Sequence, residues 1–189
     1  MRRWPIVFVL AVFLVPVFTC PAADSPAPTV YPDIDVPGGR EPSGARGGES
    51  LETLCVAEFR DVGADAINDA LKGTPMAGTG QAVINGARLY DIDPRLMVAI
   101  AMLESRCGAS PLAQLTGNAY GIGAIDSDPM QARRYSTSAK GDYDCAKLLG
   151  IYADHGRDTI PEIGARWATD PLWGQKIARI WVQQFGEEG

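Results

Sequence analysis

The sequence of 189 residues contains a single histidine, His155, and fewer basic than acidic residues, 17 against 23. The formal net charge is -6 and the pI is about 4.8. A protein that neutralises nucleic-acid phosphates normally carries a basic face, so this balance argues against nucleic-acid binding. One histidine leaves little room for histidine catalysis, and the spacing of histidine and cysteine does not match a zinc site. We therefore expect neither a metal nor another cofactor.

Other values are ordinary, since 46% of the residues are hydrophobic and 21% are charged. These values exclude wholesale disorder and a membrane protein with many spans. The N-terminus differs from this average, because residues 4–20 are almost all apolar and follow Arg2 and Arg3. This pattern indicates an export signal over residues 1–22. A retained membrane anchor and a lipoprotein modified at Cys20 are the alternatives.

Residues 23–50 form a second compositional region, in which proline and glycine dominate and large apolar residues are few. Such a segment cannot bury enough surface to offset the entropy lost on ordering, so we expect a disordered linker. Residues 51–189 contain the helical periodicity of the chain and are numerous enough for one hydrophobic core. The predicted organisation is a signal, a linker and one domain.

The spacing of apolar residues in this domain predicts a mainly α fold. Two helix starts are marked by a capping aspartate followed by proline, at Asp93-Pro94 and Asp170-Pro171. Strand alternation is weak everywhere except around 122–135, where a short β-hairpin would fit. The predicted helices are 51–71, 81–90, 94–106, a segment around 143–152, a short one from 159, and a last one after 170.

Glu104 lies near the end of the predicted helix 94–106, which is apolar on nearly all sides. A helix with that profile is central and buried. A carboxyl group at its end loses solvation of the charged form, which raises its pKa toward the range where it donates a proton near neutral pH. The alternative is a Glu104 that points to solvent or pairs with Arg95 or Arg106.

The residues around Glu104 also carry a family resemblance. The stretch VAIAMLESRCGASPLAQLTGNAYGI, residues 98–122, resembles the core motif of the bacterial glucosaminidase family, glycoside hydrolase family 73. In that motif a helix of the type A-x-x-x-L-E-S is followed by G-x-S and N-x-x-F-G-I. A second block, EIGARWATDPLWGQKI at 162–177, resembles the family's I-x-x-Y-A-T-D-P segment. The resemblance covers residues 80–185 and implies a lysozyme-like helical domain, with a small β-hairpin lobe beside the cleft.

The resemblance further implies cleavage of β-1,4 glycosidic bonds in peptidoglycan, with Glu104 as the general acid. A second carboxylate is expected in many glycosidases, and Asp126 and Asp128 are the candidates. Their alternative reading is solvated loop residues. One acid also suffices where the substrate's N-acetyl group or its own hydroxyl attacks, as in lytic transglycosylases. The sequence leaves hydrolysis and transglycosylation open.

Four further residues are candidates for substrate binding. Tyr120, Tyr135 and Trp167 are aromatic residues on which sugar rings could stack, and Tyr120 lies within the motif itself. Asn118 could bind an N-acetyl group or shape the turn. Trp167 stands where the family usually has a tyrosine with a supporting catalytic role, which leaves that role open here. Core packing is the alternative for Trp167 and the expected role of Trp173.

Cys55, Cys107 and Cys145 are an odd number of cysteines for an oxidising compartment. Cys107 follows the predicted catalytic helix and Cys145 lies on the helix after the loop. A disulfide between them is the preferred pairing, and Cys55 with Cys107 is the alternative.

Together these features predict an exported bacterial peptidoglycan hydrolase of the cell envelope, which acts as a monomer on glycan strands. The alternatives are a non-catalytic glycan-binding or scaffold domain of the same fold and a lytic transglycosylase. We expect membrane contact only through the signal or an N-terminal anchor.

Overall fold

The computed structural model describes residues 54–125 and 127–186. The predicted signal, the predicted linker and residues 51–53 of the predicted domain lie outside this range. The described residues are mostly helical, as the sequence predicts. Their helices are α1 (Ala64–Ala70), α2 (Gly80–Leu89), α3 (Pro94–Ser105), α4 (Pro111–Thr116), the 3-10 helix η1 (Pro129–Gln131), α5 (Ser138–Asp154), α6 (Ile160–Trp167) and α7 (Trp173–Phe185).

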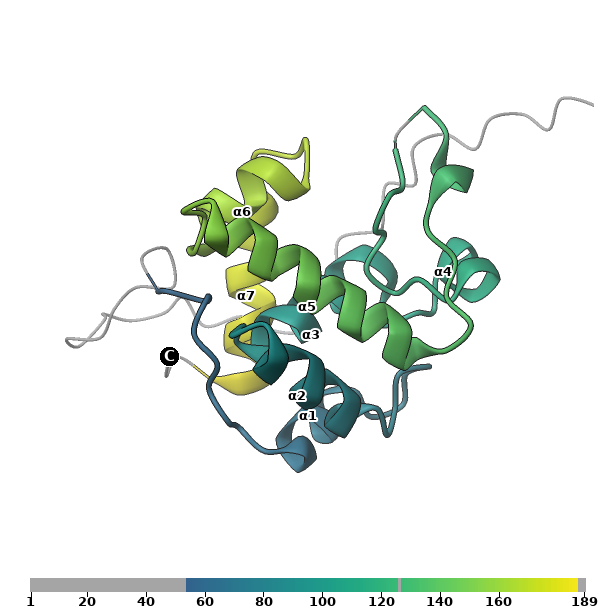
Figure 1. Cartoon of the computed structure of the whole chain (residues 1–189). Helices are drawn as coiled ribbons and strands as arrows, with labels where there is room; N and C mark the ends of the chain where they lie inside the picture. The colour runs from purple at the N-terminus through teal and green to yellow at the C-terminus, as the bar shows by residue number, and fades with distance from the viewer. Residues whose placement is uncertain (1–53, 126, 187–189) are drawn as a thin grey trace, which may run out of the picture. The chain divides into compact units, whose positions relative to one another are not determined.

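Helix α3 lies at the centre of the helical body (Figure 1). It contacts α1, α2, α5 and α7, while α2 also packs on α5 and α6 on α7. Its buried side chains include Leu96, Met97 and Ile100, all fully buried. Each such side chain contributes about 1.5–3 kcal/mol through removal from water. The prediction of a central, buried helix is confirmed.

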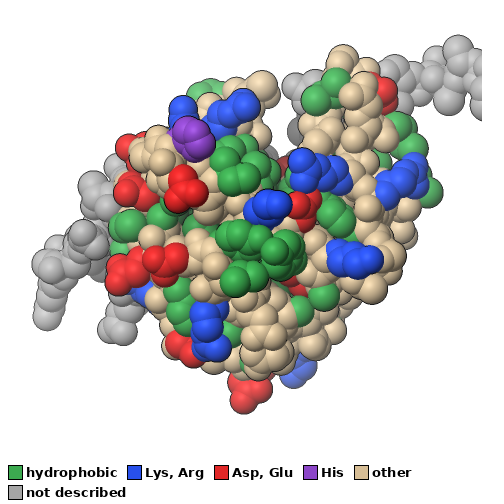
Figure 2. Space-filling view, in the orientation of Figure 1, with side chains coloured by type: hydrophobic (Ala, Val, Ile, Leu, Met, Phe, Trp, Pro, Cys, Tyr) green, Lys and Arg blue, Asp and Glu red, His purple; other side chains and the backbone are tan. Residues whose placement is uncertain are grey.

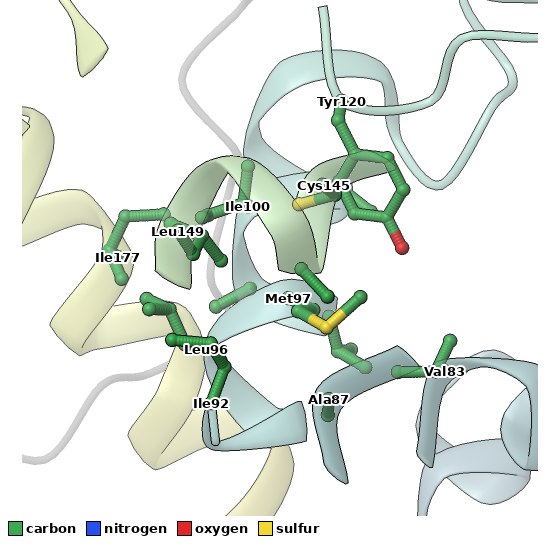
Figure 3. Packing of buried hydrophobic residues seen from close by; sticks show 14 of the residues in the cluster. Val83, Ala87, Ile92, Leu96, Met97, Ile100, Tyr120, Cys145, Leu149 and Ile177 are labelled. Carbon is green, nitrogen blue, oxygen red and sulfur yellow. The ribbon is translucent and has the colours of Figure 1, made fainter. Parts of the chain in front are cut away.

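The core around α3 draws on most of the other helices (Figure 3). Val83 and Ala87 come from α2, Leu149 from α5 and Ile177 from α7, and all four are fully buried. Segments far apart in the sequence therefore meet on one helix. The two ends of α3 are held in place by this shared core.

Residues 117–135 leave the helical body as a projecting segment (Figure 1). Its two arms are joined by backbone hydrogen bonds, from Arg133 N–H to Ile122 O at 2.9 Å and from Tyr135 N–H to Thr116 O at 2.7 Å. Its described residues form an isolated bridge between Ile125 and Asp128 and the helix η1 rather than regular strands. Figure 2 shows a notch between this segment and the part of the molecule formed by the end of α5 and by α6.

The predicted helix 51–71 is wrong over residues 54–63, because α1 begins only at Ala64. Gly63 has φ 77°, a left-handed conformation that breaks the helical path, and its N–H donates to Asp61 Oδ1. The preceding residues pair elsewhere, since Val56 N–H donates to Asp158 O at 2.7 Å and Val56 O accepts from Asp93 N–H at 2.9 Å. Tertiary pairing thus overrides the apparent helical spacing.

Helix α4 is absent from the helices that the sequence predicts. It begins with the same arrangement as α3, a capping residue followed by proline, because Ser110 Oγ accepts from Ala113 N–H and Pro111 is the first helical residue. The last helix, α7, begins at Trp173, two residues after the predicted first helical residue Pro171. None of the described helices is both long and apolar enough to span a membrane.

Candidate active site

Glu104 lies in the last turn of α3, whose end is built by local backbone geometry. Arg106 and Cys107 both have φ 53°, an uncommon conformation for residues other than glycine, and Cys107 N–H donates to Ala101 O at 2.9 Å. Ser105 Oγ accepts from Gly108 N–H at 2.7 Å. The chain therefore reverses immediately after Glu104, which leaves its side chain at the edge of the core.

Two indole groups hold one oxygen of the Glu104 carboxyl group. Trp173 Nε1–H donates to Oε1 at 2.9 Å and Trp167 Nε1–H donates to the same atom at 3.2 Å. Their rings stack on each other, with centroids 6.2 Å apart and planes 28° apart. We call Trp167 and Trp173 the indole pair. Because indole is a donor only, this pair fixes the carboxyl group without adding a charge.

Helices α6 and α7 position the indole pair. A capping box starts α6, in which Thr159 and Glu162 each bond the other's backbone. Gly164 allows α7 to approach, because a Cβ on this residue would lie 2.9 Å from Trp173 Cε3. Tyr152 meets Trp167 edge to face, with centroids 6.4 Å apart.

The other oxygen of Glu104, Oε2, faces the start of the projecting segment. A Cβ on Gly121 would lie 3.5 Å from Oε2, and Gly121 has φ 67°, which disfavours any other residue there. This turn is fixed to α3 because Ser105 Oγ donates to Ala119 O at 2.6 Å. Glu104 therefore lies between the indole pair and the start of the projecting segment.

Burial raises the pKa of Glu104 above its ordinary value of 4.5, and the hydrogen bonds from Trp173 and Trp167 oppose that rise. The side chain is only partly buried. Desolvation dominates because its hydrogen-bond donors are neutral. The raised pKa extends the pH range over which Glu104 stays protonated, and a protonated carboxyl group can donate to a bound oxygen atom. The predicted rise in pKa is confirmed in direction.

Asn118 and Tyr120, both predicted to bind substrate, are buried structural residues. Asn118 is 3% exposed, and its side-chain amide bonds Ile122 N–H and O and Arg133 O at 2.9–3.1 Å. It therefore shapes the turn, the alternative reading of this residue. Tyr120 is 1% exposed and donates its hydroxyl to Asp142 Oδ1 at 2.7 Å. A ring enclosed in the core presents no face for a sugar to stack on.

Trp167 and Tyr135, by contrast, retain exposed surface. Both are partly buried, and Tyr135 donates its hydroxyl to Asp144 Oδ2 at 2.5 Å. Burial opposes ionisation of Asp144, but hydrogen bonds from Tyr135 and Arg133, together with the charges of Arg133 and Lys147, lower its pKa overall. These contacts fix the base of the projecting segment to α5.

Of the two predicted second carboxylates, Asp128 lies in the projecting segment, whereas Asp126 lies outside the described residues. Asp128 is exposed and caps η1, since its Oδ1 accepts from Met130 N–H at 3.1 Å and its Oδ2 accepts from Gln131 at 3.2 Å. The structure thus gives Asp128 a local structural role, whereas the groups in hydrogen-bond contact with Glu104 are the two indoles.

The predicted disulfide between Cys107 and Cys145 is absent, since Cys55, Cys107 and Cys145 are all free thiols in the described part of the chain. Cys107 forms a hydrogen bond with Thr74, and burial raises the pKa of its thiol to about 12. Cys145 lies beside Tyr120 (Figure 3), and the Cys107 thiol is also close enough to this tyrosine to raise its pKa. The alternative pairing of Cys55 with Cys107 is absent as well.

Trp173 and Gly121 are the site residues that sequence reasoning missed. Trp173 was expected in the core, and it is indeed only 3% exposed, yet its N–H reaches Glu104 across 69 positions of sequence.

A groove of about 600 Å³ between α6 and α7 includes Trp173 but not Glu104, so it lies beside the site. Among the described residues, no group of three or more His, Cys, Asp or Glu side chains could hold a metal ion.

Comparison with known proteins identifies the family. The family model described as mannosyl-glycoprotein endo-beta-N-acetylglucosaminidase matches residues 80–184, more than half of the chain. The chain belongs to the glucosaminidase family. A putative endo-beta-N-acetylglucosaminidase of Streptococcus pneumoniae is 31% identical over 100 residues, which cover 50% of this chain and 15% of the relative. A bifunctional autolysin of Staphylococcus aureus is 28% identical over 167 residues, which cover 69% of this chain and 13% of the autolysin. The glucosaminidase chain thus spans a small part of these relatives.

Solved structures show the same fold. A catalytic mutant of S. aureus autolysin E, in complex with the disaccharide NAG-NAM, matches with a TM-score of 0.62 and 20% identity over 73% of each chain. The structure of a major bifunctional autolysin matches with a TM-score of 0.58 and 28% identity, covering 74% of this chain and 70% of that one. The lysozyme-like helical fold expected from the resemblance is confirmed.

Proposed function

We propose that this glucosaminidase is an exported glycoside hydrolase that cleaves β-1,4 glycosidic bonds between the aminosugars of peptidoglycan. Family membership supports the reaction class, and the NAG-NAM complex of the autolysin E neighbour supports the substrate class. The observation that carries the proposal is the environment of Glu104, a partly buried carboxyl group with a raised pKa and neutral hydrogen-bond donors. We assign it the role of general acid.

The geometry favours one oxygen of Glu104 as the proton carrier. Oε1 already accepts two indole N–H groups, so a proton is best placed on Oε2. Oε2 faces Gly121, where the missing side chain leaves room for a substrate atom. Glu104 would protonate the oxygen of the leaving sugar from this side, and the indole pair would then stabilise the resulting carboxylate.

Two aromatic residues are proposed to contact the sugars. Trp167 is partly exposed and donates a hydrogen bond to Glu104, which supports a role next to the reacting bond. Tyr135 is partly exposed at the base of the projecting segment. Asn118 and Tyr120 would act only through the shape of the turn. Asp126 and Asp128 remain predicted candidates for the second carboxylate, to be compared through their separate asparagine variants.

The proposed organisation is a signal over 1–22, a linker over 23–50 and the catalytic domain over 51–189. The apolar run behind Arg2 and Arg3 supports export to the cell envelope, where peptidoglycan lies. We propose that the mature protein works as a monomer. The intact mass of the exported protein distinguishes cleavage, an uncleaved anchor and lipidation at Cys20.

The test is Glu104→Gln, assayed by release of reducing ends from purified peptidoglycan. Glutamine can still accept both indole hydrogen bonds but cannot donate a proton as an acid. The rate should fall about 10²–10⁴-fold, with binding to cell walls retained. An unchanged rate would overturn the assignment of Glu104. Absence of cleavage by the wild-type protein, with wall binding intact, would instead favour a glycan-binding domain.

Mass spectrometry of the same digest separates the two reaction routes. Hydrolysis adds water and yields reducing ends, as proposed here. Intramolecular attack by the sugar's own hydroxyl yields anhydro ends, and their appearance would identify a lytic transglycosylase.

A further inference from the structure

A buried aspartate on α5, Asp142, is the polar group that the fold explains least. It is fully buried, and its Oδ1 accepts the hydroxyl hydrogen of Tyr120 at 2.7 Å. Its Oδ2 has no hydrogen-bond partner, one of two such buried side-chain atoms in the described residues. Burying a carboxyl group with one partner costs stability, and an apolar pair could fill this space without that cost.

The partner of Asp142 lies in the turn that borders Glu104. Tyr120 stands between Ala119, whose carbonyl oxygen accepts from Ser105 Oγ, and Gly121, which faces Glu104 Oε2. The turn therefore has two anchors, Ser105 at the end of α3 and Asp142 on α5. Both anchors act on residues directly next to Gly121.

We infer that Asp142 and Tyr120 form a positioning pair for the proposed reaction: their hydrogen bond holds the turn so that Gly121 stays against Oε2 of Glu104. Asp142 acts through Tyr120 and does not touch the substrate. This inference rests on the proposed function of Glu104. It explains why a buried carboxyl group is kept where an apolar residue would pack, because an apolar contact is less directional than a hydrogen bond.

The burial of the pair agrees with this role. Tyr120 keeps its hydroxyl hydrogen, since burial, followed by the nearby Asp142 and Cys145, raises the pKa of Tyr120 well above 10. It therefore remains a donor to Asp142 over the whole range in which the enzyme would work. Asp142 can accept this bond in either protonation state, because Oδ1 keeps a free lone pair in both.

The experiment compares Tyr120→Phe, Asp142→Asn and the double variant Tyr120→Phe/Asp142→Leu. Each is measured for its denaturation midpoint and for kcat and KM on purified peptidoglycan. Tyr143→Phe is the matched control, because it deletes an exposed tyrosine hydroxyl on the same helix, where it bonds Tyr90. Asp142→Asn retains an acceptor oxygen for Tyr120.

Tyr120→Phe should lower kcat about ten- to a hundredfold through misplacement of the turn, with KM within about twofold. Asp142→Asn and Tyr143→Phe should keep kcat near the wild-type value. The double variant should recover the denaturation midpoint lost in Tyr120→Phe but not kcat. Recovery of both would reduce the pair to core packing and overturn the inference.

Glu104→Gln in the same assay separates the two proposals. An inactive Glu104→Gln together with a fully active Tyr120→Phe overturns the positioning pair alone. An active Glu104→Gln overturns the proposed function, whatever Tyr120→Phe does.

Discussion

Helix α3 carries a carboxyl group at each end, and the two are built in opposite ways. Asp93 caps the first turn, is fully buried, and accepts from Arg95 N–H at 2.9 Å and from its guanidinium at 2.7–3.0 Å. Glu104, in the last turn, is partly buried and accepts from two neutral indoles. One helix thus ends in an ion pair on one side and in an uncharged hydrogen-bond network on the other.

The difference follows from partner charge and from the helix dipole. The N-terminus of a helix favours a carboxylate, and Arg95 adds a positive charge, so the negative charge of Asp93 is well compensated. The C-terminus of a helix disfavours a carboxylate, and the indoles carry no charge. The first arrangement stabilises the start of the helix, whereas the second one accompanies a raised pKa of Glu104, which favours its protonated form.

The largest expected effect is on stability, from Asp93→Ala. This variant removes the helix cap and one side of the buried ion pair with Arg95, whose guanidinium lies over Trp181, 4.5 Å from the ring centroid. Loss of one partner of a buried ion pair costs about 3–5 kcal/mol in the free energy of unfolding. Urea denaturation measures it. A loss below about 1 kcal/mol, the range of an exposed ion pair, would show that this end of α3 is not the structural one.

A smaller effect is expected at the other end, from Trp173→Phe. The stack with Trp167 can persist, but the shorter hydrogen bond to Glu104 is lost. The ionised form of Glu104 then loses about 1.5–3 kcal/mol of stabilisation. Because that bond lowers the pKa of Glu104, its removal should raise it. The rate should fall, because the carboxylate that remains after proton transfer has lost a hydrogen bond. The alkaline limb of the pH–rate profile should move to higher pH, because Glu104 stays protonated there. Trp167→Phe, which removes the longer bond, is the matched control and should shift the limb less. A limb that moves to lower pH would contradict the assigned role of the indole pair.

The smallest effect concerns the stability of Glu104→Gln as a function of pH. A carboxyl group with a raised pKa in the folded state stabilises the fold below its unfolded pKa, and that contribution is lost as pH rises through the folded pKa. The unfolding free energy of the wild type should therefore decrease relative to that of Glu104→Gln as pH rises from below 4.5. Asp142, whose pKa burial raises to about 6, titrates in both proteins and cancels. A difference that favours the wild type at higher pH would contradict the account.

Local signals in the sequence predicted most of the helices. Asp93-Pro94 marks the start of α3 because cap and first turn depend on neighbours within a few positions. Ser110-Pro111 carries the same signal for α4, and the glycines around it concealed that helix. The segment before Gly63 could not be predicted, because its partners Asp158 and Asp93 lie far along the chain.

The candidate site could be predicted in part for the same reason. The position of Glu104 at the end of an apolar helix is a local pattern, so its raised pKa follows from sequence. Its contact with Trp173 depends on the packing of α7 against α3, and no spacing within one sequence reports that. Tyr120 carried a misleading signal, since an aromatic residue in a glycine-rich turn fits a sugar platform as well as a core position.

The most direct test of the central claim is the pKa of Glu104 itself. Titration of side-chain-labelled glutamate by carbon NMR gives this value, with Glu104→Gln used to assign the resonance. We predict a pKa above the ordinary value of 4.5 in the wild type, and a higher one in Trp173→Phe. A wild-type pKa at or below 4.5 would contradict the claim that the end of α3 holds a proton for catalysis.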